Sequence, residues 1–234
     1  MSLLTVAQAV AEEIGLPAPD TMVGATDDTV KQILRMINRT GKKLAKKNWS
    51  VLQNEHTFSL VAGTAYYDLP SDYDRMIVET AWDRTTYWSL RGQLTPREWQ
   101  IRKSGLVATV STRLNFRIKP LTRVNKFYVD PTPTSTDSLV FEYISSKWVR
   151  DAGNANGKTA YALDDDVALI SEELLELGAI WRMLDRKGFA YAEAKDEYDR
   201  EVDNAYAEDG GALTLDMGAG RVTGSNLPEG NFTL

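Results

Sequence analysis

The period of the hydrophobic residues changes twice along this chain, and these two changes constrain the fold more than any other feature. Near both ends, apolar residues recur at three and four positions, which is typical of helices that bury one face. Between them lie short runs rich in β-branched and aromatic residues, such as "RLNFRIKP" and "DSLVFEYISS". The pattern predicts an α+β chain in which helices from both termini form a bundle, with a β sandwich or barrel inserted between them.

Two helices are expected before the strands. The first lies in "SLLTVAQAVAEEIG" and stops at Gly15 and Pro17. The second lies in "TDDTVKQILRMINRTGKKLAKKNW", with Thr26 as the predicted N-cap. At about 100° per residue, its apolar residues share one face; they are Val30, Ile33, Leu34, Ile37 and Leu44. Its cations occupy the opposite face; they are Lys31, Arg35, Arg39, Lys42, Lys43, Lys46 and Lys47.

Helical periodicity returns after the strands, from about Val167 to Glu208, and a break is expected near Lys187 and Gly188. The first half of this stretch carries a predicted apolar stripe of Leu174, Leu177, Ile180, Trp181 and Leu184. The second half continues it with Tyr191, Ala194, Tyr198, Val202, Ala205 and Tyr206. This stretch supplies the C-terminal part of the predicted bundle.

The middle of the chain reads as strands with one short helix. A hairpin is expected to turn at Ala62 and Gly63, and Thr95 followed by Pro96 indicates the start of a helix in "TPREWQIRKSG". The predicted boundaries are a helical part over 1–54, a β domain over 55–150, a second helical part over 151–209, and an extended tail over 210–234.

Opposite charges are segregated along the chain. Residues 27–50 hold seven basic and two acidic residues, a net charge of +5, whereas residues 164–209 hold fifteen acidic and five basic residues, a net charge of −10. The total of −6 provides no general attraction to nucleic acid. The basic helix face is interpreted as a solvated face or as the partner of a neighbour's acidic helix, and contact with DNA phosphates is the alternative.

The tail over 210–234 is rich in glycine and follows neither a helical nor a strand period. Such a tract buries too little surface to offset the entropy of ordering it, so we expect it to be disordered in the free subunit and ordered on a partner. Its predicted contact residues are spaced as separate anchors; they are Leu213, Leu215, Arg221, Val222, Leu227 and Phe232.

No pattern of residues points to catalysis, so we expect no enzyme, no cofactor and no metal site. The single His56 has no second histidine to work with and is interpreted as a surface residue at a strand end. Asp164 to Asp166 could hold a metal, but capping of the following helix is the preferred interpretation. "DAGNANGK" does not match a calcium loop, and the absence of cysteine excludes disulfides and zinc–thiolate sites.

Several stretches, in this order and spacing, carry a resemblance to a known family. They are "SLLTVAQAVAEEIGLP", "VGATDDTVKQILRMINRTGKKLAKKNWSVL", "YDLPSDYDRMIVETAWDRTT", "LTPREW", "FEYISSKWVRD" and "DDDVALISEELLELGAIWRMLDRKGFAYAEAKDEYDREV". From about Leu3 to Gly211 the chain resembles the head-to-tail adaptor (connector) proteins of tailed bacteriophages. It is most similar to the type that carries a β insertion in a helical core and is related to the tail tubular proteins of short-tailed phages.

The resemblance implies a structural protein of the virion, found in the host cytoplasm during assembly and not in a membrane. Such adaptors form a ring of about twelve copies under the portal of the head. The ring extends the DNA channel, binds no DNA sequence specifically, and carries the next tail protein. Relatives reach into the portal with an extended C-terminal segment, which places residues 210–234 as the portal-binding element.

A subunit interface between two sets of charged residues is predicted. Three other functions remain as alternatives. The interface would join Lys42, Lys43, Lys46 and Lys47 of one copy to Glu193, Glu197 and Glu201 of the next. The channel would be lined with more acid than base, because a basic lining would hold DNA phosphates. The alternatives are a stopper or tail-tube component, a glycan hydrolase using Glu172 and Glu176, and a DNA-binding module using the basic helix.

Overall fold

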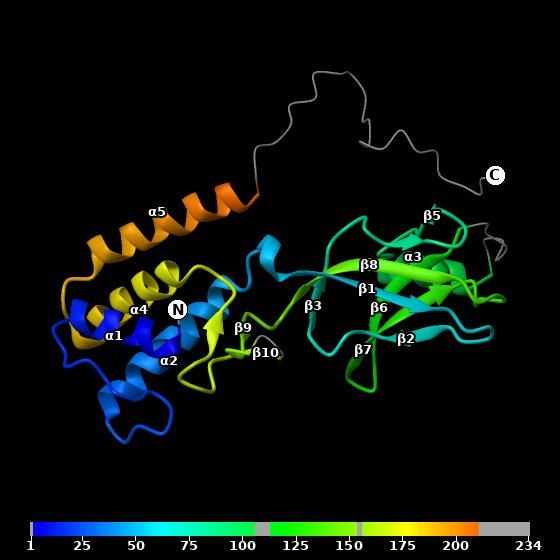
Figure 1. The fold of residues 1–234 in the computed structure, drawn as a ribbon. Helices are drawn as coiled ribbons and strands as arrows, with labels where there is room; N and C mark the ends of the chain where they lie inside the picture. The colour runs from blue at the N-terminus through cyan, green and yellow to red at the C-terminus, as the bar shows by residue number, and fades with distance from the viewer. Residues whose placement is uncertain (1, 106–112, 154–155, 211–234) are drawn as a thin grey trace. The chain divides into compact units, whose positions relative to one another are not determined.

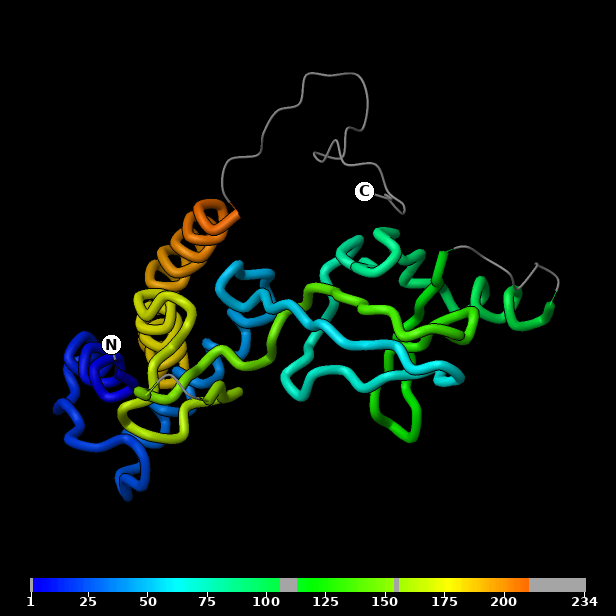
Figure 2. The backbone as a smooth tube through the Cα atoms, turned by 45° about the vertical axis from the view of Figure 1, so that its right-hand side comes forward, coloured from blue at the N-terminus to red at the C-terminus, as the bar shows by residue number. Residues whose placement is uncertain are grey.

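The computed structural model describes every residue except 1, 106–112, 154–155 and 211–234. The chain forms two compact units. One begins at the N-terminus, runs to Gln53 and resumes at Ser145; we call it the helical unit (Figure 1). The other runs from Asn54 to Ile144, and we call it the β unit. Figure 2 follows the backbone out of the helical unit after the short 3₁₀ helix Ser50–Leu52 and back again after β8 (Ser138–Ser145).

The helical unit begins with α1 (Leu3–Glu13) and α2 (Asp28–Leu44). Ser2 and Thr5 form a capping box at the start of α1, and Gly15 follows its end with a φ of 69°. The expected N-cap of α2 was wrong by one residue, because the side chain of Asp27, not that of Thr26, accepts the Thr29 amide at 2.7 Å. The helix ends at Leu44, so Lys46 and Lys47 lie beyond it.

The C-terminal helices are α4 (Glu172–Lys187) and α5 (Ala192–Asp209). The predicted break is confirmed, since Gly188 adopts a left-handed conformation at the end of α4. The predicted start at Val167 was wrong, because Val167–Ala168 forms β11 and α4 begins five residues later. β11 pairs with β9 (Val149–Arg150), whose other neighbour is β10 (Gly157–Lys158). This small sheet was not predicted from the sequence.

α4 is the central helix of this unit and packs against α1, α2 and α5 (Figure 1). The crossing of α2 and α4 is tight because small side chains meet there: a Cβ added to Gly178 would lie 2.3 Å from Cγ2 of Thr40. The buried side of α4 therefore differs from the predicted stripe, of which only Leu174 is fully buried. The other buried residues are Leu175, Gly178, Ala179, Arg182 and Met183. On α5 only Tyr198 and Val202 are buried.

The β unit contains two antiparallel sheets and α3 (Pro96–Lys103). The five-stranded sheet has the order β1-β8-β4-β5, with β3 also paired to β8; its strands besides β8 are β1 (Gln53–Ser59), β3 (Tyr73–Met76), β4 (Trp82–Asp83) and β5 (Trp88–Ser89). The three-stranded sheet has the order β2-β7-β6, from β2 (Tyr66–Asp68), β6 (Asn115–Leu121) and β7 (Val124–Asp130).

The prediction of a hairpin at Ala62 and Gly63 was wrong, because the strands on the two sides of this turn do not pair with each other. The chain does turn there, with the Thr64 amide donating to the Val61 carbonyl at 3.0 Å. The strands on either side, however, join different sheets, since β1 pairs with β8 and β2 pairs with β7. The turn therefore connects the two sheets of the β unit instead of closing a hairpin.

Aromatic rings fill the core of the β unit. Phe116 and Phe127 stack at 4.9 Å, and Phe127 stacks on Phe141 of the other sheet at 5.4 Å.

The helix α3 begins as predicted, with a capping box between Thr95 and Glu98 and Pro96 in its first turn. It is held to the sheet by Arg102, whose Nε lies 3.0 Å from the buried carboxylate of Asp130. The described residues thus form a mixed α+β fold, as predicted.

Candidate functional site

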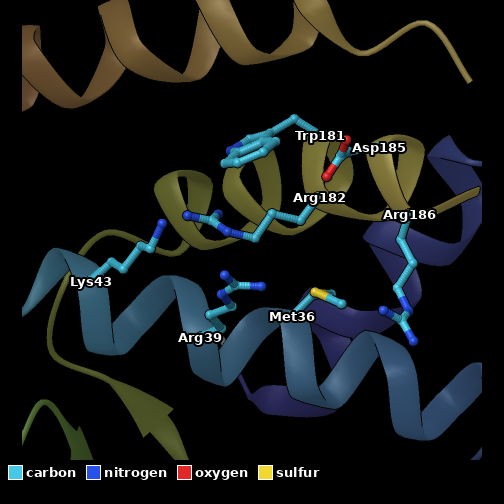
Figure 3. Close-up of a pocket in the computed structure, with 7 residues that line it drawn as sticks. All are labelled: Met36, Arg39, Lys43, Trp181, Arg182, Asp185 and Arg186. Atoms are coloured by element: carbon cyan, nitrogen blue, oxygen red, sulfur yellow. The ribbon is translucent and has the colours of Figure 1, made fainter. Parts of the chain in front are cut away.

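The helical unit carries a basic pocket between α2 and α4, which we call the α2–α4 pocket. Its volume is about 250 Å³, and its lining residues are Met36, Arg39, Lys43, Trp181, Arg182, Asp185 and Arg186. Figure 3 shows the charged ends of Arg39, Lys43 and Arg182 gathered near one end, with Arg186 beyond Met36 at the other. Four cations and one carboxylate thus line a single small cavity.

Arg182 is the buried member of this group, with 4% of its surface exposed. Its Nη1 donates to Oγ1 of Thr40 at 2.8 Å and to the Gly178 carbonyl, both at the tight crossing of α2 and α4. Its guanidinium lies 4.3 Å from the ring centre of Trp181 and 5.5 Å from that of Tyr198. Burial lowers the pKa of Arg182, which remains charged in the neutral range.

Two buried donors of the pocket have no acceptor within the described residues: Nε of Arg182 and Nε1 of Trp181. A buried N–H without an acceptor is costly. Neighbouring positive charge also acts on Lys43: Arg182 is the main cause of its lowered pKa, followed by burial and by Arg39 and Lys46. The pocket is therefore suited to an anion that can accept hydrogen bonds.

The predicted interface residues lie in two places. Lys42, Lys43 and Lys46 are exposed, whereas Nζ of Lys47 is 3.1 Å from Asp203 of the same chain and 5.0 Å from the ring centre of Tyr206. A second groove is lined by Lys43 of α2, by Lys47 just beyond the end of α2, and by Asp199 and Asp203 of α5. Lys47, which was predicted to pair with an acid of a neighbouring copy, therefore pairs with an acid of its own helical unit.

The outer surface of α5 carries the remaining predicted residues. Glu193 and Glu197 are exposed and Glu201 is half-buried. Glu193, Asp196 and Glu197, which we call the α5 acidic face, form no ion pair within the part of the chain that the structure describes. The predicted tail residues Leu213, Leu215, Arg221, Val222, Leu227 and Phe232 lie outside the described residues.

The three aspartates before α4 have a different role from the one predicted. The carboxylate of Asp164 accepts the amides of Met22 and Val23, at 2.8 Å for Val23. The carboxylate of Asp166 accepts Lys158 at 2.7 Å and two amides of the preceding loop. None of the three caps α4, which begins at Glu172; instead, the backbone carbonyls of Asp164 and Asp166 accept the first amides of α1. Within the described residues, no cluster of three or more His, Cys, Asp or Glu side chains could hold a metal.

Replacing Asp166 is expected to make the protein less stable at neutral pH. Although burial opposes it, Lys158 and the loop amides hold the pKa of Asp166 below its usual range. A lowered folded-state pKa contributes stability above the unfolded pKa of about 3.9, and this contribution is lost as the pH falls through the folded value. Asp166→Asn should therefore lower the free energy of unfolding by about 1–3 kcal/mol at pH 7, with the difference from wild type shrinking below about pH 4.

Denaturant titrations at several pH values would measure this difference. The matched control is Asp165→Asn, since Asp165 is exposed and has no partner among the described residues. A variant at Asp166 that is as stable as the control at pH 7 would contradict the assigned role.

The other candidates for chemistry are dispersed. His56 lies within β1, not at a strand end; it is half-buried, with its ring 5.4 Å from that of Phe141. Burial lowers the pKa of His56, against the influence of Asp72. Burial also raises the pKa of Glu176, with Glu172 adding to the effect. His56 lies on β1 of the β unit, whereas Glu172 and Glu176 lie on α4 of the helical unit.

Sequence reasoning missed the α2–α4 pocket, although a signal for it existed. Arg182 interrupts the apolar run "LGAIWRML" of α4, where a charged residue requires partners once the helix is buried. The prediction assigned the apolar residues around Arg182 to a buried stripe and did not consider Arg182 itself.

These observations define a class: an α+β protein whose helical unit presents a basic pocket and an acidic helix face on different residues. The family model for SU10 adaptor protein matches residues 1–223. The chain belongs to the SU10 adaptor protein family, which confirms the resemblance to phage head-to-tail adaptors. Membership indicates a structural role in a phage particle, linking portal and tail.

A search of curated proteins finds no match. Among the described helices, none has the length and apolar content needed to span a membrane.

Proposed function

We propose that this protein forms a ring that joins the portal of the phage head to the tail and extends the DNA channel. The observation that carries the proposal is the family match over residues 1–223, which includes both compact units. Packing of α4 against α1, α2 and α5 supports a helical bundle as the ring-forming part. The two sheets joined through the Phe127 stack support a β sandwich as the inserted part.

Neighbouring copies in this ring pack through their helical units with opposite charges facing. Lys42 and Lys43 are exposed on one side, and Glu193 and Glu197 on the other. Each exposed pair contributes only about 0–1 kcal/mol, so these pairs set the register of the ring more than its strength. The surplus acid of residues 164–209 lines the channel, where it keeps DNA phosphates from being held.

The tail over 210–234 is the portal-binding element in this proposal. Its composition argues against autonomous folding, and strand addition or separate apolar anchors would both suit a portal surface. Weak binding by each tail would be strengthened by the number of copies in the ring. The portal above, a nozzle or tail-tube protein below and other copies of this chain are its partners.

Deleting the chain after Asp209 is expected to leave a folded, soluble protein that no longer docks on DNA-filled heads. Circular dichroism would report folding, and sedimentation of heads followed by detection of the adaptor would report docking. The matched control replaces residues 210–234 by a Gly/Ser segment of equal length, which preserves length but removes the anchors. Normal docking of the truncated protein would contradict the role of the tail.

Electron microscopy of the purified particle tests the proposal as a whole. A ring of this chain directly below the portal is the expected result. A ring further down the tail would instead support a stopper or tail-tube component, and absence of the chain from particles would refute a structural role.

A further inference from the structure

Cations outnumber carboxylates four to one in the lining of the α2–α4 pocket, and the acid that acts on Arg182 is Asp199 of α5. Arg39, Lys43, Arg182 and Arg186 form no ion pair within the described residues, and Asp185 pairs with none of them. Figure 3 shows three of the four charged ends, those of Arg39, Lys43 and Arg182, gathered together. Like charges this close repel one another unless an anion lies among them.

The pocket also has a built inner wall. Arg182 is 4% exposed, its Nη1 is fixed by Thr40 at 2.8 Å, and its Nε has no acceptor among the described residues. The Nε1 donor of Trp181 next to it is likewise buried without an acceptor. A guanidinium held in place binds carboxylates well, because its planar donors match the two carboxylate oxygens.

A complementary surface exists on the same chain. Glu193 and Glu197 lie four residues apart on α5, so they project from one side of that helix. Both are exposed and neither has an ion-pair partner within the described part of the chain. The groove that Glu193 lines on α5 shares no residue with the α2–α4 pocket, although the groove lined by Lys43, Asp199 and Asp203 shares residues with both. Two different surfaces are what a head-to-tail contact between identical copies requires.

We infer that the α2–α4 pocket binds the Glu193 and Glu197 carboxylates of a second copy of this chain. The inference deepens the proposed ring and rests on it, and it moves the centre of the contact from the exposed lysines to the pocket containing Arg182. A carboxylate entering beside Arg182 meets a desolvated charge, where an ion pair is stronger than on the open surface.

Carboxylates fit this position better than the phosphates of DNA. The pocket is a cavity of about 250 Å³, large enough for side-chain carboxylates, within a helical unit whose 164–209 segment has a net charge of −10. That surrounding charge repels an extended polyanion but permits a helix that places one or two carboxylates in the pocket.

Charge reversal with rescue tests the inference. Arg39→Glu with Arg186→Glu reverses two exposed cations of the pocket and leaves buried Arg182 in place. Glu193→Lys with Glu197→Lys reverses two of the three residues of the α5 acidic face. Each pair of changes is expected to lower incorporation into particles by about tenfold or more, because like charges then face each other. All four changes in one chain are expected to restore it.

The matched control is Arg35→Glu with Lys187→Glu, which reverses two exposed cations on the same helices outside the pocket. Thermal unfolding of each purified variant identifies variants that fail to fold. Incorporation is measured by supplying each variant to a phage that lacks its own copy of the gene. Equal loss in the control, or no rescue by the fourfold variant, would overturn the inference.

Carbodiimide cross-linking of wild-type particles gives a second measurement that needs no variant. Particles are assembled from a mixture of ¹⁴N and ¹⁵N chains, so that mass spectrometry distinguishes links between copies from links within one. Mixed-isotope links from Lys43 to Glu193 or Glu197 are expected. The inference would be overturned if Lys43 formed links only within its own chain or only to another protein. It would also be overturned if DNA protected Lys43 from cross-linking until the particles were treated with nuclease. If wild-type chains never enter particles, the proposed function itself fails instead.

Discussion

Gly41→Val is expected to destabilise the helical unit by about 3 kcal/mol or more, because overpacking at this position cannot be relieved. A Cβ on Gly41 would lie 2.1 Å from Cη2 of Trp148. The indole cannot move aside easily: it is 1% exposed, its Nε1 donates to the Thr159 carbonyl at 2.8 Å, and its ring meets that of Tyr161 edge-on at 5.3 Å. Denaturant unfolding followed by far-UV circular dichroism would measure the loss.

Two further variants separate this clash from a general effect of replacing glycine. Gly153→Ala adds a methyl group where no atom lies within 4 Å, so its stability should be within about 0.5 kcal/mol of wild type. Trp148→Phe shortens the indole that a Cβ at Gly41 would strike. The double variant Gly41→Ala with Trp148→Phe should therefore be less destabilised than the sum of its single changes. Strict additivity would show that the contact does not limit the packing of α2 against the segment before β9.

Local signals in the sequence were sufficient to predict the helices and part of the buried face of α2, but not the buried face of α4. The capping residues of α3 and the break at Gly188 depend on neighbouring residues alone, and both were confirmed. The buried face of α4 depends on its three helical neighbours. Gly178 and Ala179 are buried because α2 approaches closely, and a count of large apolar residues cannot detect that.

Strand pairing was less predictable because it is not a local property. The turn at Gly63 was identified, yet nothing in its sequence indicates that β1 and β2 join different sheets. That choice depends on which later strands, β8 and β7, are present to pair with them. The two-residue strands β9, β10 and β11 are too short to carry a period.

The candidate site shows the same division between local and distant information. The segregation of acid and base along the sequence indicated that charge would matter, but it could not separate contacts inside a chain from contacts between chains. Lys47 meets Asp203 of its own chain, whereas Arg39, Lys43 and Arg182 meet one another. Only the crossing of α2 and α4 brings these three cations together.

Phe127→Ala is expected to be the most damaging single change in the β unit, with a loss of about 3–5 kcal/mol. Phe127 is 1% exposed and its ring lies nearly parallel to two others, at 6° to Phe116 and 3° to Phe141. Phe141 belongs to the five-stranded sheet, and Phe116 and Phe127 to the three-stranded sheet, so the removed ring lies between the sheets.

Hydrogen exchange would locate this effect as well as measure it. Amides of β7 and β8 are expected to exchange faster in Phe127→Ala, because their protection depends on the sheets remaining packed. Val124→Ala is the matched control, since Val124 lies on the same strand and is 58% exposed; it should change the free energy of unfolding by less than about 0.5 kcal/mol. Equal exchange in the two variants would mean that the aromatic stack does not hold the sheets together. The turn at Gly63, which joins β1 to β2, and the chain connections would then have to do so.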